Sequence, residues 1–277
     1  MKYILFILIF ITIREEIFPQ NALVNQFNYA KEIYNEGHYF DSITEFKRLM
    51  FFDSTGKYNF TANNYIGDAY KAGKKFSNAI NYYTLAEINA ENYNDLFTAK
   101  INIIRVNILR RTTNRALQLL DSLNNDKKFS NKKKEIYYWK GWAYIFADDW
   151  QKASGAFALT DSNGTLQKLC EKVEKEKYSV VFAQIISYLI PGSGQFYTGN
   201  YLSGLLSFAW NGLWGYLAVK AFMADRIFDG FAITNFLWLR FYSGNLQNSK
   251  NFAEEKNLKI ANKALKFLQY NYVGTKP

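Results

Sequence analysis

The feature that most constrains the fold is a fourfold repeat, with a step of 37 residues, in the first part of this 277-residue chain. At each step a small residue recurs, and a large residue follows it four positions later. The small residues are Ser42, Ala79, Ala116 and Ala153, and the large ones are Phe46, Tyr83, Leu120 and Phe157. A large or β-branched residue also precedes each small one by three positions, at Tyr39, Phe76, Thr113 and Trp150. A fixed period in this range is typical of stacked helical repeats, in which each unit buries its apolar face against its neighbours.

A second helical pattern precedes each small residue. It is clearest in the second repeat, which reads Ile66-Gly67-Asp68-Ala69-Tyr70, then Phe76, Ala79, Ile80, Tyr83 and Ala86. The fourth repeat has Gly141, Tyr144, Trp150, Ala153 and Phe157, and the first has Tyr29-Ala30, Ile33, Tyr39, Ser42 and Phe46. This pattern resembles the tetratricopeptide repeat (TPR). The third repeat departs from it, because Ile104 holds the glycine position and Asn107 the tyrosine position.

The resemblance implies an all-α solenoid of four helical hairpins over residues 23–162. The usual TPR has about 34 residues, so the extra residues of each repeat are expected in the loops between repeats. The first helix of each repeat is expected near 24–36, 61–73, 97–110 and 134–147, and the second near 40–52, 76–89, 113–124 and 150–160.

The resemblance also implies that the first helices line a concave groove that binds a partner protein or peptide. Carrying the groove positions onto this chain predicts Phe27, Lys31, Tyr34, Asn64, Asp68, Lys71, Arg105, Tyr138 and Trp142, with Ile101, Ile108 and Ile145 beside them. This aromatic, apolar and basic lining suits an extended peptide or a helix that carries a carboxylate. The alternative is that some of these side chains pack against a neighbouring helix.

Residues 1–22 are interpreted as a signal peptide, with a retained N-terminal anchor as the alternative. The basic Met1-Lys2 start is followed by an apolar run from Tyr3 to Ile13, which is the length of a signal-peptide core and short for a spanning helix. Export would place the repeats in the periplasm.

Residues 163–178 are expected to form a charged helix that caps the repeats, with Leu166, Leu169 and Val173 on one face. Cys170 on that face is interpreted as a packing residue. The basic run 124–134 is interpreted as a solvated loop, with anionic headgroups as the alternative ligand. Nucleic acid is disfavoured as a partner because the N-terminus predicts export.

Residues 179–247 carry three apolar stretches, the middle of which, from about Tyr201 to Met223, is long enough to cross a bilayer. The turn Pro191-Gly192-Ser193-Gly194-Gln195-Phe196-Tyr197-Thr198-Gly199 resembles a P-G-x-G-Q-x-Y-x-G motif of C-terminal membrane hairpins, similar to TM2-type domains of bacterial envelope proteins. The resemblance implies an α-helical membrane hairpin and carries no biochemical activity with it.

Polar residues interrupt this apolar segment. Ser203, Ser207, Asn211 and Gly215 recur every four residues, as in helix contacts inside membranes. Arg240 is costly at membrane depth, so we expect it either to form a polar site with Asn211, Gln195 or a carbonyl of the glycine turn, or to reach the interface. Residues 248–277 are predicted to form a basic amphipathic tail on anionic headgroups.

The net charge of +10 favours anionic partners or membrane surfaces. One cysteine and one histidine exclude an intramolecular disulfide framework and an ordinary zinc site. His38 stands in a repeat turn with no catalytic constellation around it, so no catalytic residue, cofactor or enzymatic activity is predicted.

The sequence therefore predicts a membrane-anchored TPR scaffold that binds a partner protein in the bacterial cell envelope, on the inner membrane with the repeats in the periplasm. Lysine-rich flanks at 172–177 and 250–266 favour the cytoplasmic side instead, so topology stays open. The alternatives are a cytoplasm-facing inner-membrane adaptor, and an oligomeric membrane component that handles a small solute.

Overall fold

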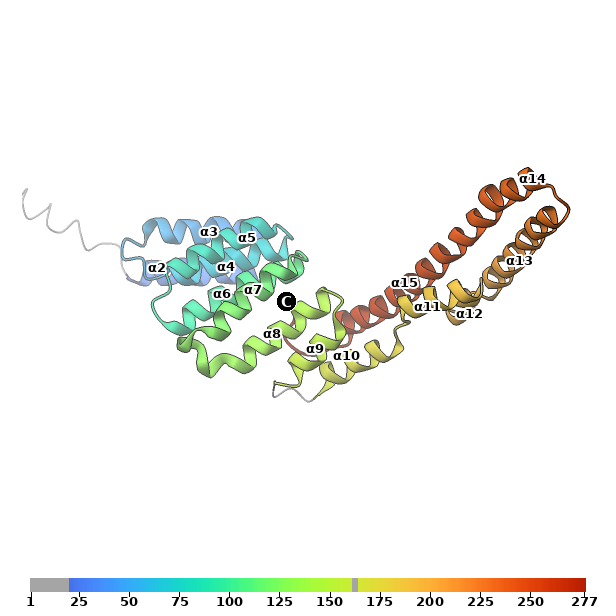
Figure 1. Cartoon of the computed structure of the whole chain (residues 1–277). Helices are drawn as coiled ribbons and strands as arrows, with labels where there is room; N and C mark the ends of the chain where they lie inside the picture. The colour runs from blue at the N-terminus through green and yellow to red at the C-terminus, as the bar shows by residue number, and fades with distance from the viewer. Residues whose placement is uncertain (1–19, 161–163) are drawn as a thin grey trace, which may run out of the picture. The chain divides into compact units, whose positions relative to one another are not determined.

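The computed structural model describes residues 20–160 and 164–277 (Figure 1). The described residues contain helices and no strand, which confirms the all-α class. They fall into two compact units, Met1–Gly164 with Lys276–Pro277, and Thr165–Thr275. The predicted signal peptide or anchor lies outside the described residues, except for its last three positions, which belong to the first described helix.

The first unit is a series of helical hairpins, drawn from blue to green in Figure 1. Its helices are α2 (Gln20–Asn35), α3 (Tyr39–Phe52), α4 (Asn59–Ala72), α5 (Phe76–Ile88), α6 (Tyr93–Leu109), α7 (Thr113–Asn125), α8 (Lys133–Phe146) and α9 (Trp150–Phe157). Each helix packs against the next one along the chain from α2 to α9. Each helix expected within the repeats therefore has a counterpart, and the assignment to the TPR family stays a prediction.

The basic run 124–134 differs from the expected loop. It contains a short 3₁₀ segment, η2 (Lys127–Lys132), whose Phe129 is buried and lies 5.4 Å from the ring of Phe97. Burial of one aromatic side chain thus anchors an otherwise exposed basic connection.

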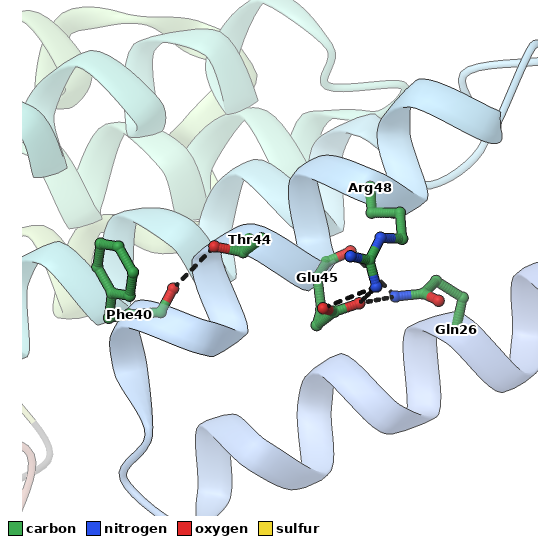
Figure 2. Close-up of polar contacts among 5 residues, drawn as sticks. All are labelled: Gln26, Phe40, Thr44, Glu45 and Arg48. Carbon is green, nitrogen blue, oxygen red and sulfur yellow. Dashed lines mark hydrogen bonds and ion pairs between the residues drawn. The ribbon is translucent and has the colours of Figure 1, made fainter.

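The first hairpin is joined by polar side chains as well as by its core (Figure 2). The Gln26 amide on α2 donates to Glu45 Oε2 on α3 at 2.7 Å, and Arg48 Nη1 donates to the same oxygen at 2.6 Å. On the same helix, the Thr44 hydroxyl donates to the carbonyl of Phe40 at 3.3 Å.

The core of each hairpin places a residue of the first helix and a residue of the second helix at matched positions, sixteen apart in the sequence. A Cβ added to Gly67 would lie 2.5 Å from the Tyr83 ring, and one added to Gly141 would lie 2.5 Å from the Phe157 ring. In the third repeat the residue on the first helix, Ile104, is larger than glycine, and the residue on the second helix, Leu120, is smaller than an aromatic one. All eight residues of the four pairs are buried. The four pairs are Ala30 with Phe46, Gly67 with Tyr83, Ile104 with Leu120, and Gly141 with Phe157.

The turn inside each hairpin also repeats every 37 residues. Gly37, Lys74, Arg111 and Asp148 all have positive φ, between 58° and 85°. In the second repeat the Lys74 N–H donates to the carbonyl of Lys71 at 2.9 Å, and the Lys75 N–H donates to the carbonyl of Tyr70 at 2.8 Å. The same pair of bonds ends α2, α6 and α8. This is the Schellman motif, which terminates a helix and reverses the chain.

The second unit comprises α10 (Thr165–Glu176), α11 (Val180–Leu189), α12 (Ser193–Tyr197), α13 (Tyr201–Met223), α14 (Ile227–Ala232), the π-helical segment η3 (Ile233–Trp238) and α15 (Leu239–Tyr270). α15 is continuous across the boundary expected at 247, so the end of the third apolar stretch, which runs from Phe231 to about Ser243, and most of the basic tail lie in one helix. α10 packs against α15 and is grouped with this unit, so its expected role as a cap of the repeats stays a prediction.

The Pro-Gly-Ser-Gly turn packs tightly between helices of this unit. Gly192 has a φ of 95°, and a Cβ there would collide with the backbone of Gly204 on α13. The Gly192 N–H donates to Asn245 Oδ1 at 2.7 Å, and the Gly194 N–H donates to Ser187 Oγ at 2.9 Å. Gly192 is thus required both by the left-handed conformation and by the close backbone approach, and Gly194 by the close approach to the carbonyl of Ala183.

Over residues 20–160 and 164–277, none of the helices combines the length and apolarity that a membrane crossing demands.

The packing of Gly141 under Phe157 predicts a coupled pair. Gly141→Ala should destabilise the first unit by about 1–3 kcal/mol, because the new methyl group overlaps the ring. Phe157→Leu in the same chain should recover part of this loss, since Ile104 and Leu120 show that a bulkier first residue is accommodated beside leucine. Urea unfolding of the two single variants and the double variant measures the coupling.

Gly155→Ala is the matched control: it has open space around it and should stabilise α9 by about 0.5–1 kcal/mol. Additive effects at Gly141 and Phe157 would contradict this packing.

The left-handed turn residue predicts a stabilising substitution. Lys74→Gly should raise the free energy of unfolding by about 0.5–1 kcal/mol, because a side chain disfavours positive φ. Lys75→Gly is the neighbouring control, where φ is −86° and no gain is expected. Equal effects of the two substitutions in urea unfolding would argue against the turn geometry.

Candidate functional site

The predicted groove residues of the second and third repeats form a polar cluster on α4 and α6. Asn102 Nδ2 donates to Asn64 Oδ1 at 3.1 Å, and Arg105 Nη1 donates to Asn102 Oδ1 at 3.3 Å. Arg105 also lies over the ring of Trp139 on α8, with its Cζ 5.1 Å from the ring centroid. Three successive first helices therefore hold the guanidinium in place.

Asp68 is the acidic member of this cluster. Its Oδ1 accepts a hydrogen bond of 2.7 Å from the Tyr83 hydroxyl and lies 3.7 Å from Lys71 Nζ. Burial and the Asp68 charge raise the pKa of Tyr34 to about 12, and the same causes raise the pKa of Tyr83. Both phenols therefore stay protonated, and Tyr83 serves as a donor to the carboxylate.

Lys71 and Arg105 make this surface basic. Burial, and then the nearby positive charge of Arg105, lower the pKa of Lys71, while Asp68 opposes the shift. Two cations thus face one carboxylate, and that carboxylate already accepts from Tyr83. The cluster has positive charge available for a ligand.

The last two residues of the chain belong to the first unit, and Lys276 contacts this cluster. Arg105 Nη2 donates to the main-chain carbonyl of Lys276 at 2.9 Å. Arg105 Nε is buried and has no hydrogen-bond partner among the described residues. The guanidinium therefore binds a peptide main-chain group, and its Nε donor is unused.

The aromatic residues predicted for the groove pack between helices. Phe27 stacks on Tyr58 at 5.4 Å and packs with the core of the first hairpins, and Tyr34 contacts Tyr65 at 5.2 Å. Trp142 is buried, with Tyr138 at 6.5 Å. These four aromatic residues contribute to helix packing, which is the alternative that the sequence left open.

Lys31 is exposed on α2 and makes no hydrogen bond or ion pair within the part of the chain that the structure describes. Ile101, Ile108 and Ile145 are buried. None of these four belongs to the hydrogen-bonded cluster.

Sequence reasoning missed Asn102, Trp139 and Lys276. Asn102 and Trp139 each follow a predicted groove position, Ile101 and Tyr138, by one residue. A shift of one residue rotates a helical side chain by about 100°, so the repeat pattern alone could not separate these positions. Asn102 stands one helical turn before Arg105, which is the signal that could have found it.

The second predicted polar site, in the second unit, is only partly assembled. Gln195 is fully buried, and its Nε2 donates to Asn245 Oδ1 at 3.0 Å and to Ser207 Oγ at 3.2 Å. Asn211 Nδ2 donates to the carbonyl of Ser207 at 2.8 Å. Arg240 makes no hydrogen bond or ion pair with any described residue, so it does not pair directly with Gln195 or Asn211. Arg240 and Asn211 nevertheless line one recess of about 520 Å³ between α13 and α15.

Among the described residues, no group of three or more His, Cys, Asp or Glu side chains is arranged to hold a metal ion. Comparisons with protein-family models, with curated proteins and with solved structures found no match.

Removing the Arg105 charge should change the titration of Lys71. Arg105→Gln is expected to raise the pKa of Lys71, because one of the two causes of its depression is lost. The pKa of Lys71 is lower in the folded protein than in the unfolded chain, so between these two pH values the folded state binds fewer protons. The free energy of unfolding therefore rises as pH rises through this range. NMR titration of the lysine side chain measures the shift. Arg110→Gln, on the same helix end, is the control, and an unchanged Lys71 pKa in Arg105→Gln would contradict the proximity of the two cations.

Proposed function

We propose that this chain is a TPR scaffold whose groove, centred on Arg105, binds an extended peptide of a partner protein. The observation that carries the proposal is the 2.9 Å hydrogen bond from Arg105 Nη2 to the main-chain carbonyl of Lys276. Every extended peptide has main-chain carbonyls, so the same hydrogen bond can form with a peptide of any sequence.

The surroundings of Arg105 favour a peptide that also carries a carboxylate. Asn102 and Trp139 hold the guanidinium before any ligand arrives, which reduces the conformational entropy lost on binding. Lys71 lies beside it and is partly desolvated by burial. A carboxylate placed here would gain charge-assisted hydrogen bonds, which are roughly twice as strong as neutral ones.

The peptide hypothesis is tested with the chain's own last residues. A fluorescent peptide of residues 271–277 should bind saturably to a chain shortened by those residues. Arg105→Gln should weaken that binding by about tenfold, since a hydrogen bond from a charged donor contributes about 1.5–3 kcal/mol and 1.4 kcal/mol corresponds to tenfold. Fluorescence anisotropy measures the dissociation constants.

The matched control for this experiment is Arg110→Gln, which removes one positive charge from the end of the same helix and should leave the affinity unchanged. Equal losses in the two variants would indicate non-specific charge attraction. Equal affinity of Arg105→Gln and the unsubstituted chain would remove Arg105 from the site.

We also propose that the second unit attaches the scaffold to a bilayer of the bacterial cell envelope. The support is a large exposed apolar surface on α11, α13 and α14, where Leu189, Met223 and Phe228 are 79%, 81% and 91% exposed. Soluble monomers rarely expose contiguous apolar patches of more than a few hundred Å². The later half of α15 adds exposed lysines, including Lys259 and Lys263, which suit anionic headgroups.

The preferred location is the inner membrane with the repeats in the periplasm, and the alternative is a cytoplasm-facing adaptor. The other alternative is a membrane component that handles a small solute. Two helices per chain cannot enclose a path for a solute, so this component would be an oligomer in which a second copy covers the apolar surface.

A further inference from the structure

We infer that the recess between α13 and α15 is a binding site for a phosphate ester, with Arg240 as its anion-binding residue. Two stripes of residues, each with a spacing of four, face this recess. They are Ser203, Ser207 and Asn211 on α13, and Arg240, Gly244 and Asn248 on α15. The absence of a side chain at Gly244 leaves space between the two helices.

The charge of the recess favours an anion. Arg240 is the only charged residue among the described residues that line it. From 179 to 253 the sequence has only two carboxylates, Asp225 and Asp229, and Arg226 already pairs with Asp229 at 3.7 Å. Arg240 makes no hydrogen bond or ion pair with a described residue, so its planar fork of donors is available to a bidentate oxyanion.

The polar lining favours a phosphate ester over a simple carboxylate. Two hydroxyl groups, on Ser203 and Ser207, and the Asn248 amide lie along the same recess and can donate to further oxygens. A carboxylate has only two oxygens, whereas a phosphate ester offers additional acceptors to these donors.

A buried acceptor without a donor is the independent observation that indicates a ligand. Asn211 is 4% exposed, and its Oδ1 has no hydrogen-bond partner among the described residues. A buried acceptor left unpaired costs about 1–3 kcal/mol. When the Asn211 side chain turns toward the recess that it lines, this oxygen can accept from a hydroxyl or ammonium group on the ligand, so the ligand class is a phosphate ester that carries such a donor.

The walls of the recess suit an amphipathic source of this ligand. Trp210 and Phe241 stack at 5.8 Å, and Leu202 and Leu206 line the recess beside them. An anionic lipid headgroup would place its phosphate at Arg240 and its acyl chains along the exposed apolar face. For this source the inference rests on the proposed bilayer association; a soluble phosphate ester would not need it.

The first experiment measures binding of the full chain to vesicles of phosphatidylcholine with and without phosphatidylglycerol, by co-sedimentation at 0.15 M salt. Arg240→Gln should lower the affinity for the phosphatidylglycerol vesicles at least fivefold. Lys220→Gln removes another exposed cation of the same hairpin and should lower it less than twofold. Equal losses would overturn the Arg240 site. If the unsubstituted chain binds neither kind of vesicle, the bilayer proposal is overturned, and a soluble phosphate ester remains as the ligand to be tested.

The second experiment distinguishes the two sources with glycerol 3-phosphate, followed by NMR of the tryptophan indole N–H groups. The indole N–H signal of Trp210 should then shift saturably, and both Arg240→Gln and Asn211→Leu should abolish the shift. That result would show that a soluble phosphate ester binds the recess without a lipid. No shift, together with Arg240-dependent vesicle binding, would assign the lipid headgroup. If neither glycerol 3-phosphate nor phosphatidylglycerol vesicles respond to Arg240→Gln in a chain whose circular dichroism is unchanged, the site does not bind phosphate esters.

Discussion

The first unit depends on how closely the two helices of each hairpin approach. In the second and fourth repeats an aromatic ring lies directly over a glycine Cα, so Tyr83 and Phe157 occupy the space that a side chain at Gly67 or Gly141 would take. The third repeat distributes similar bulk differently, with Ile104 and Leu120. Protein interiors are close-packed, so the sum of the two side chains is constrained more strongly than either one. This explains how the third repeat departs from the sequence pattern while keeping the helical hairpin.

The polar cluster follows from that stacking. Asp68 and Arg105 hold the same position in successive repeats, 37 residues apart, so stacked first helices bring them to one surface. Tyr83 has two roles, since its ring packs on Gly67 and its hydroxyl donates to Asp68. The residue that fixes helix spacing therefore also orients a charge in the polar cluster, and the fold and the proposed peptide site share one side chain.

In the second unit, backbone approach again takes the place of side-chain packing. Gly192 and Gly194 let the turn lie against α13 and α11, while buried Asn245 and Gln195 satisfy the polar groups that this approach encloses. These amides hold the helices together internally. Asn211 Oδ1 and Gln195 Oε1 are both buried without a hydrogen-bond partner among the described residues. Asn211 and Arg240 line the recess and Gln195 does not, and this separates the structural amide from the residues that we assign to a ligand.

The sequence by itself determined the all-α class and the order of the paired helices, because a period of 37 residues fixes both of these locally. Tertiary structure decided which side chains join the polar cluster around Arg105. Phe27 and Trp142 pack inward, whereas Asn102 and Trp139, each one position after a predicted groove residue, support Arg105. A shift of one residue turns a side chain by about 100° around the helix axis. A repeat pattern fixes the position of a helix along the chain only to within about one or two residues, so it does not fix which side chains face one surface. Tertiary structure alone also brought Lys276 to Arg105, since no local pattern couples residues 171 positions apart.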